Sequence, residues 1–73
     1  SVKIGDLVVV VKNDMSLAWN KHGNKDNKFF NKVGTVIATF DRDNFAGIPY
    51  SWYDVMFSVG IYSMREDVIK SIE

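Results

Sequence analysis

Side chains that usually carry out catalysis are scarce in this sequence. There is no cysteine, and the single histidine, His22, lies between Lys21 and Gly23. A catalytic histidine needs a nucleophile within reach and a partner that orients its ring. No serine here stands in a known nucleophile motif. We therefore predict that His22 is a solvated loop residue and that the protein is not an enzyme.

The segment at residues 41–44, Asp-Arg-Asp-Asn, has the spacing with which a calcium-binding loop begins. An EF-hand loop continues with an oxygen ligand, then glycine, and ends on glutamate. Phe45, Ala46 and Trp52 occupy those three positions, so the match fails. Aspartate and asparagine also stabilise tight turns through their own side chains. We expect a turn in this segment, and neither a metal nor a cofactor.

Residues 12–32 form a basic segment with interspersed aromatic side chains. It holds five lysines and two aspartates, a local charge of +3, whereas the rest of the chain carries −3. Ammonium groups neutralise phosphates and aromatic faces stack on bases when a protein holds single-stranded nucleic acid. We predict binding of single-stranded nucleic acid, RNA more than DNA, with lysines on phosphate and aromatic rings on bases. The predicted nucleic-acid-binding residues are Trp19, Lys21, Lys25, Lys28, Phe30 and Lys32.

The same segment has a structural alternative. Phe29 and Phe30 are large apolar groups that can fold back over an open end of the fold and act as a lid. In that case they close the open end of the barrel or cover Leu7, Val9 and Val11 of the first strand, instead of contacting a ligand. The sequence leaves the choice between a lid and a binding surface open.

The segments around this loop read as β-strands. Alternating apolar residues predict strands at 2–12, 33–40 and 50–57, with short strands at 61–64 and 68–72. A long loop spans 13–31, a hairpin connection spans 41–49, and a 3₁₀ turn is expected at 65–67. Pro49 should mark the edge of a strand, because proline cannot donate a ladder hydrogen bond. In the second strand, alternation places Gly34, Val36, Ala38 and Phe40 on one face, and we expect Gly34 at a corner of the fold.

Apolar residues on both faces of the first strand predict a second covered surface. Val8 and Val10 should face the core, which leaves Val9 and Val11 on the other side. Tyr50 and Trp52 share a strand face with Met56, and aromatic residues are favoured at protein interfaces. The predicted interface, for self-association or docking on a larger assembly, consists of Val9, Val11, Tyr50, Trp52 and Met56.

This strand layout is that of an SH3-like barrel: all-β, five-stranded and partly open, with a long first loop and a 3₁₀ turn before the last strand. Four motifs carry a resemblance: Gly5-Asp6-x-Val8-x-Val10, Val33-Gly34-Thr35-Val36, Tyr53-Asp54-Val55-Met56-Phe57 and Arg65-Glu66-Asp67-Val68. They resemble KOW-type and related SH3-like barrels, and the second and third are also similar to the SH3-like photosystem I subunit IV. The signature Ala-Leu-Tyr-Asp-Tyr of signalling SH3 domains is absent, so binding of proline-rich peptides is not expected.

Size and composition fit one domain over residues 1–73. A core this small has little stability in reserve, and without cysteine neither a disulfide nor a thiolate zinc site can reinforce it. A net charge of zero differs from that of strongly basic nucleic-acid binders. No apolar run approaches the length of a membrane span, so we expect a cytoplasmic protein. The two functions predicted are binding of single-stranded RNA and a structural or adaptor role, as an Sm-like ring or a phage-type accessory protein.

Overall fold

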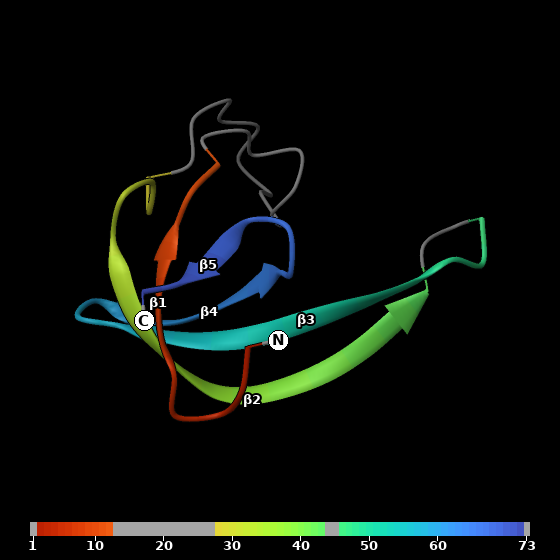
Figure 1. Ribbon diagram of the computed structural model, residues 1–73, viewed down its shortest axis with the longest axis horizontal. Helices are drawn as coiled ribbons and strands as arrows, with labels where there is room; N and C mark the ends of the chain where they lie inside the picture. Colours follow the sequence, from red (N-terminus) through yellow and green to blue (C-terminus); the bar gives the residue numbers. More distant parts are fainter. Residues whose placement is uncertain (1, 13–27, 44–45, 73) are drawn as a thin grey trace.

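The computed structural model describes residues 2–12, 28–43 and 46–72, and it places them in one five-stranded antiparallel sheet. The order across the sheet is β4-β3-β2-β1-β5 (Figure 1). The described residues include no helix, so the all-β prediction is confirmed, and no helix long and apolar enough to cross a membrane occurs among them. The sheet curves but does not close into a barrel, because β4 and β5 stand at its two ends. The strands are β1 (Leu7–Val10), β2 (Val33–Asp43), β3 (Pro49–Phe57), β4 (Gly60–Arg65) and β5 (Ile69–Ser71).

The first strand is shorter than the predicted 2–12. A turn precedes it, in which the Asp6 backbone N–H donates to the Lys3 carbonyl (3.0 Å) and the Asp6 carboxylate accepts from the Lys3 N–H (2.9 Å). Gly5 has a φ of 96°, which glycine adopts without strain. The strand therefore begins only at Leu7, although the Gly5 N–H still donates to the Val36 carbonyl (2.8 Å). After β4, residues 66–68 form a turn in which the Val68 N–H donates to the Arg65 carbonyl (2.9 Å).

A β-bulge in β2 changes which face its side chains occupy. Val36 pairs with Val55, but the next registered pair joins Ala38 to Asp54, so Ile37 is an extra residue. Such a residue reverses the alternation that follows it. The prediction that Ala38 and Phe40 share a face with Gly34 and Val36 is therefore wrong. Phe40 instead lies opposite Trp52 on the other face.

The core covers one face of the sheet, which we call the inner face. Valines from β1, β2 and β3 lie fully buried on it, and Phe29, from the turn before β2, packs over them. The opposite, outer face carries the alternate residues of each strand. The buried apolar residues are Val8, Val10, Phe29, Val36, Tyr53, Val55, Phe57, Met64, Val68 and Ile69.

Gly34 lies at a very close approach of two strands inside the core. A Cβ atom at this position would lie 2.5 Å from Cγ1 of Val55, 2.9 Å from the Met56 carbonyl oxygen and 3.1 Å from Cδ1 of Phe57. The first part of β2 is strongly curved (Figure 1). Glycine thus allows β3 side chains to pack directly on the β2 backbone where the sheet bends.

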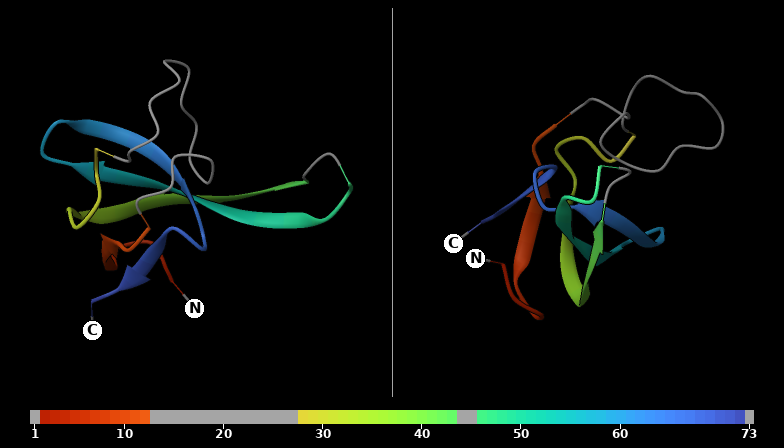
Figure 2. Two further views of the ribbon diagram at one scale, coloured as in Figure 1. Left: turned by 90° about the horizontal axis from the view of Figure 1, so that it is seen from above. Right: turned by 90° about the vertical axis from the view of Figure 1, so that its right-hand side faces the viewer.

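The hairpin of β2 and β3 extends beyond the rest of the sheet. The pairing of β3 with β4 ends at Trp52 and Arg65, whereas β2 and β3 remain paired as far as Asp43 and Pro49. We call residues 41–43 and 49–51 the arm; Figure 2 shows the hairpin projecting away from the other strands. Two-stranded hairpins are marginally stable in water, so side-chain contacts near its base are needed to hold the arm.

Candidate functional site

The turn at residues 28–31 is fixed to the end of β1 by backbone hydrogen bonds. The Asn31 N–H donates to the Val10 carbonyl (2.9 Å), and the Val10 N–H donates to the Lys32 carbonyl (3.1 Å). Asn31 has a φ of 63°, a left-handed conformation that asparagine tolerates better than most residues. These bonds hold the turn, and with it the lysines at its two ends, in place against the sheet.

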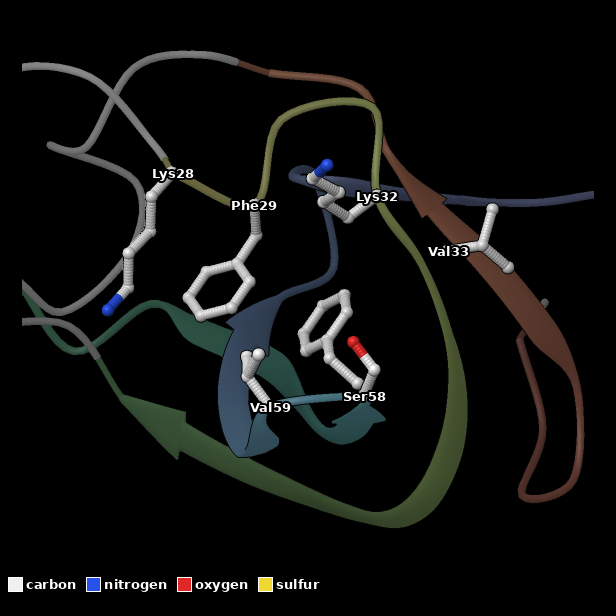
Figure 3. Close-up of a pocket in the computed structure, with 7 residues that line it drawn as sticks. Lys28, Phe29, Lys32, Val33, Ser58 and Val59 are labelled. Atoms are coloured by element: carbon white, nitrogen blue, oxygen red, sulfur yellow. The ribbon is translucent and has the colours of Figure 1, made fainter.

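Next to this turn is a pocket of about 390 Å³, which we call the lysine pocket. In Figure 3 the side chains of Lys28 and Lys32 leave the turn on either side of Phe29. The Lys28 ammonium lies 5.3 Å from the centre of the Phe29 ring and 5.5 Å from that of Tyr62, within cation–π range. The pocket therefore combines two cations with aromatic walls. Its lining residues are Lys28, Phe29, Lys32, Val33, Phe57, Ser58 and Val59.

The two phenylalanines of the turn differ in environment. Phe29 is 7% exposed and stacks on Phe57, with ring centres 4.7 Å apart and planes 22° apart. It also contacts Tyr62, at 4.4 Å between ring centres. Phe30 is 38% exposed. Of the two rings that the lid alternative names, only Phe29 is buried in the core, and Phe30 remains accessible to a ligand.

The structure brings together only part of the predicted nucleic-acid-binding set. Lys28 and Lys32 line one pocket, and Phe30 lies between them in the chain. Trp19, Lys21 and Lys25 lie outside the described residues, as does His22. Asp41 and Asp43 belong to β2, and no group of three or more acidic, histidine or cysteine side chains that could hold a metal occurs in residues 2–12, 28–43 and 46–72.

A second hollow, of about 380 Å³, lies on the outer face near the base of the arm. Its lining residues are Phe40, Arg42, Trp52 and Ser63, and we call this group the aromatic platform. The Phe40 and Trp52 rings are nearly parallel, with planes 9° apart and centres 6.4 Å apart. The sequence indicated Trp52 but missed Phe40, since simple alternation places Phe40 on the face of Gly34 and Val36.

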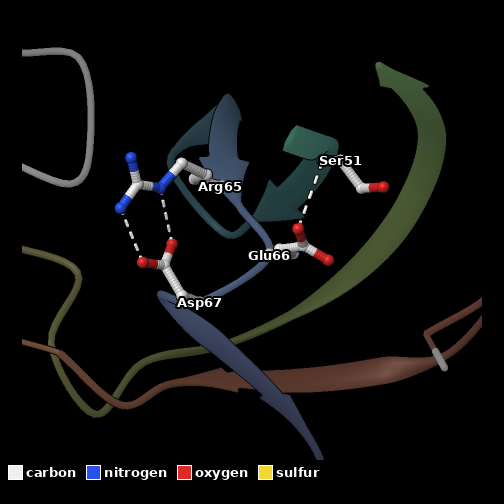
Figure 4. A network of polar contacts seen from close by, with 4 residues as sticks. All are labelled: Ser51, Arg65, Glu66 and Asp67. Atoms are coloured by element: carbon white, nitrogen blue, oxygen red, sulfur yellow. Dashed lines mark hydrogen bonds and ion pairs between the residues drawn. The ribbon is translucent and has the colours of Figure 1, made fainter. Parts of the chain in front are cut away.

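The turn after β4 is tied to the base of the arm by polar contacts (Figure 4). Glu66 donates its backbone N–H to the Ser51 carbonyl (2.9 Å), and its carboxylate accepts from the Ser51 N–H (3.4 Å). The Arg65 guanidinium donates two hydrogen bonds to Asp67 (2.7 and 2.6 Å), which lower the pKa of the Asp67 carboxyl and raise the pKa of Arg65. Burial, assisted by Glu66 and Asp41, raises the pKa of Tyr53. We interpret these contacts as structural.

Exposed apolar side chains run across the outer face at the end remote from the arm. Leu7 pairs with Thr35, Thr35 with Met56, and Met56 with Ile61, so neighbouring strands contribute to a single row. The Ile72 N–H, next to β5, donates to the Leu7 carbonyl (3.1 Å). We call Leu7, Met56, Ile61 and Ile72 the apolar row; they are 51%, 48%, 56% and 47% exposed.

The predicted interface residues fall into two groups. Met56 belongs to the apolar row, and the half-buried Val9 pairs with Val33 beside it. Val11, which is exposed, follows the end of β1. Tyr50 and Trp52 are half-buried near the arm, where the guanidinium of Arg65 lies 4.3 Å from the Tyr50 ring centre. Asp54 separates the aromatic pair from Met56 along β3, so the five residues do not form one continuous patch.

Comparison with known proteins gives no relatives for this arrangement. No protein-family model matches the chain, and neither a curated protein nor a solved structure matches it.

Proposed function

We propose that this protein is a non-enzymatic binding module that holds single-stranded nucleic acid, RNA in preference to DNA, at the turn of residues 28–32. The observation that carries the proposal is the lysine pocket, which two lysine side chains line together with aromatic rings, while Phe30 remains exposed on the same turn. This combination suits a chain of phosphates and bases. It suits a small neutral metabolite less well, because two cations would then lack an anionic partner.

Each residue of the turn has a separate role in this proposal. Lys28 and Lys32 contact successive phosphates, and Phe30 provides a face on which one base stacks. The cation–π contacts of Lys28 with Phe29 and Tyr62 keep its ammonium at the pocket, which lowers the entropic cost of binding. Trp19, Lys21 and Lys25 belong to the same proposal as further contacts along the strand.

The fold proposed for this function is the partly open SH3-like barrel, related to KOW-type domains. The strand order β4-β3-β2-β1-β5 supports this fold. In it the first strand, β1, pairs on one side with β2, the first of the hairpin-linked strands β2 to β4, and on the other side with the last strand, β5. A turn at residues 66–68 precedes β5, at the place where the 3₁₀ turn is expected.

Removing both lysines of the pocket should weaken RNA binding and reduce its dependence on salt. For single strands, the slope of log affinity against log salt falls by about 0.7 for each phosphate that the protein no longer neutralises. We therefore expect Lys28→Gln with Lys32→Gln to reduce the slope by about 1.4. The measurement is titration of labelled single-stranded RNA at several salt concentrations, and Lys3→Gln with Lys70→Gln, two exposed lysines outside the turn, is the control.

Phe30→Ala provides the stacking part of the same test. Removal of one stacking face should lower the affinity by about 5- to 150-fold, without a decrease in stability, because Phe30 is exposed. Failure of the unaltered protein to retard RNA at low salt would contradict the proposal. So would equal decreases in affinity from the pocket pair and from the control pair of lysines.

A second candidate function is a structural or adaptor role through self-association. The apolar row favours it, because apolar side chains aligned across neighbouring strands on one sheet face mark protein interfaces more often than scattered ones do. Two copies facing each other through this row would cover Met56 and Ile61, and a ring of the Sm-like kind would also bury the strand edges.

The mass of the protein in solution tests this second function. We expect sedimentation equilibrium at high concentration to give a dimer or larger species, and Met56→Lys with Ile61→Lys to give a monomer, because a buried lysine without a partner is costly. Ile48→Lys, an equally exposed position in the connection between β2 and β3, should leave the assembly unchanged. A monomeric unaltered protein would exclude self-association.

A further inference from the structure

We propose that the aromatic platform is a second binding site, which takes a phosphorylated nucleotide with its base on the Phe40–Trp52 pair and its phosphate toward Arg42. This nucleotide is either free or part of a single strand. Only the single-strand form rests on the proposed function, since a free nucleotide requires nothing from the lysine pocket.

The platform offers two ring faces to one ligand. Phe40 and Trp52 are directly paired across β2 and β3, and their planes differ by only 9°. Parallel rings whose centres are 6.4 Å apart are offset, so neither ring covers the other completely. Both side chains are half-buried, which fixes their orientation and leaves part of each accessible. A base is flat and has the area to lie across the adjoining hollow of about 380 Å³.

Arg42 supplies the positive charge. It lies opposite Tyr50 on the same outer face, and its Cζ is 5.4 Å from the centre of the Phe40 ring. Among the described residues, no carboxylate forms an ion pair with Arg42, and Asp41 instead accepts a hydrogen bond from the Ser51 hydroxyl (3.0 Å). A guanidinium held beside an aromatic ring, with its donors available, is suited to bidentate recognition of phosphate.

The other side of the hollow favours the base. The Ser63 hydroxyl donates to Asp54 (2.6 Å), so the Ser63 oxygen retains lone pairs that accept from an amino group. The Asp54 carboxylate disfavours a phosphate at this side. The charges thus orient the ligand, with phosphate at Arg42 and the base at Ser63. A base that carries an exocyclic amino group, such as adenine, is therefore the kind we expect to bind.

Because the chain has two tryptophans, binding at the platform can be measured separately from binding at the basic segment. Trp52 belongs to the platform and Trp19 to the basic segment, so the variant Trp19→Phe leaves Trp52 as the only indole. We expect AMP to quench the Trp52 fluorescence of this variant in a saturable manner, and adenosine to bind more weakly because it lacks phosphate. Single-stranded oligoadenylate tests the form in which the nucleotide is part of a strand.

Two substitutions in the Trp19→Phe background test the assigned roles. Arg42→Gln should weaken AMP binding by about 10-fold or more and leave adenosine binding unchanged. Phe40→Leu retains apolar volume but removes a ring face, and it should weaken binding of both ligands by about 5-fold or more. Circular dichroism verifies that each variant remains folded. Lys28→Gln with Lys32→Gln should leave the AMP response unchanged.

The outcomes separate this inference from the proposed function. RNA binding without any Trp52 quenching by AMP or oligoadenylate would overturn the second site and leave the lysine pocket standing. Quenching by AMP that requires Arg42, in a protein that does not retard RNA, would support a free-nucleotide site and remove the proposed function. Equal AMP affinity in the Arg42→Gln variant would overturn the assigned orientation and the proposal with it.

Discussion

Replacing Phe29 with alanine is expected to lower the free energy of unfolding by about 3 to 5 kcal/mol. The ring is 7% exposed and packs on both Phe57 and Tyr62, so its removal leaves a cavity at the open end of the core. A domain of this size has a total stability of roughly 4 to 11 kcal/mol. The midpoint of thermal unfolding should therefore fall by about 12 °C or more.

Phe30→Ala is the matched control, because it removes the same ring from the adjacent position of the same turn. Phe30 is exposed, and we expect its removal to change the unfolding free energy by about 0.5 kcal/mol or less. If Phe29→Ala does not fold at all, Phe29→Leu provides a smaller truncation that still removes the aromatic ring. Equal effects of Phe29→Ala and Phe30→Ala would show that Phe29 does not act as the lid.

Gly34→Ala is expected to destabilise the protein by about 1 to 3 kcal/mol through overcrowding. The added methyl group would lie 2.5 Å from Cγ1 of Val55 and 2.9 Å from the Met56 carbonyl oxygen. The valine side chain can adjust, but the carbonyl belongs to the β3 backbone, so β2 and β3 must separate locally. Chemical denaturation of the purified variant measures the decrease in the unfolding free energy directly.

A double-substitution cycle isolates the crowding at Gly34. Val55→Ala removes the nearest atom, so the added methyl should cost less in the Val55→Ala background than in the unaltered protein, with a coupling of about 1 kcal/mol. Gly5→Ala has no atom within 4 Å of its added Cβ but requires a φ of 96°, so it measures backbone strain without crowding. An unchanged unfolding free energy for Gly34→Ala would mean that the close approach does not constrain the core.

Alternation along the strands predicted the inner face well, and the exception has a physical cause. Val8, Val10, Val55 and Phe57 are buried as their periodicity indicates. In β2 the sequence from residue 36 to 40 is apolar or small on both sides of the strand, so nothing in the pattern marks the extra residue at Ile37. The position of the bulge is set by how β2 pairs with β3, and this pairing depends on the folded structure as a whole.

The candidate sites were also predictable to different degrees, because some of their features depend on the sequence alone and others on how the strands pair. The lysines at 28 and 32 were identified because the clustering of positive charge between residues 12 and 32 can be read directly from the order of residues, without the fold. The division between Phe29 and Phe30 was not visible, since both residues are identical in type and adjacent. Phe40 and Arg42 were missed as partners of Trp52, because their proximity depends on the bulge and on pairing across a hairpin.

The pairing of β1 with β5 has a consequence for synthesis on the ribosome. Val8 pairs with Ser71, and Val10 with Ile69, so the two strands are separated by most of the chain. Contacts between distant segments form only after a large loop has closed, and they slow folding. While the chain is being translated, one edge of β1 therefore has no native neighbour until the last strand emerges. For that period the edge of β1, with its four successive apolar residues, can pair wrongly with strands of other nascent chains.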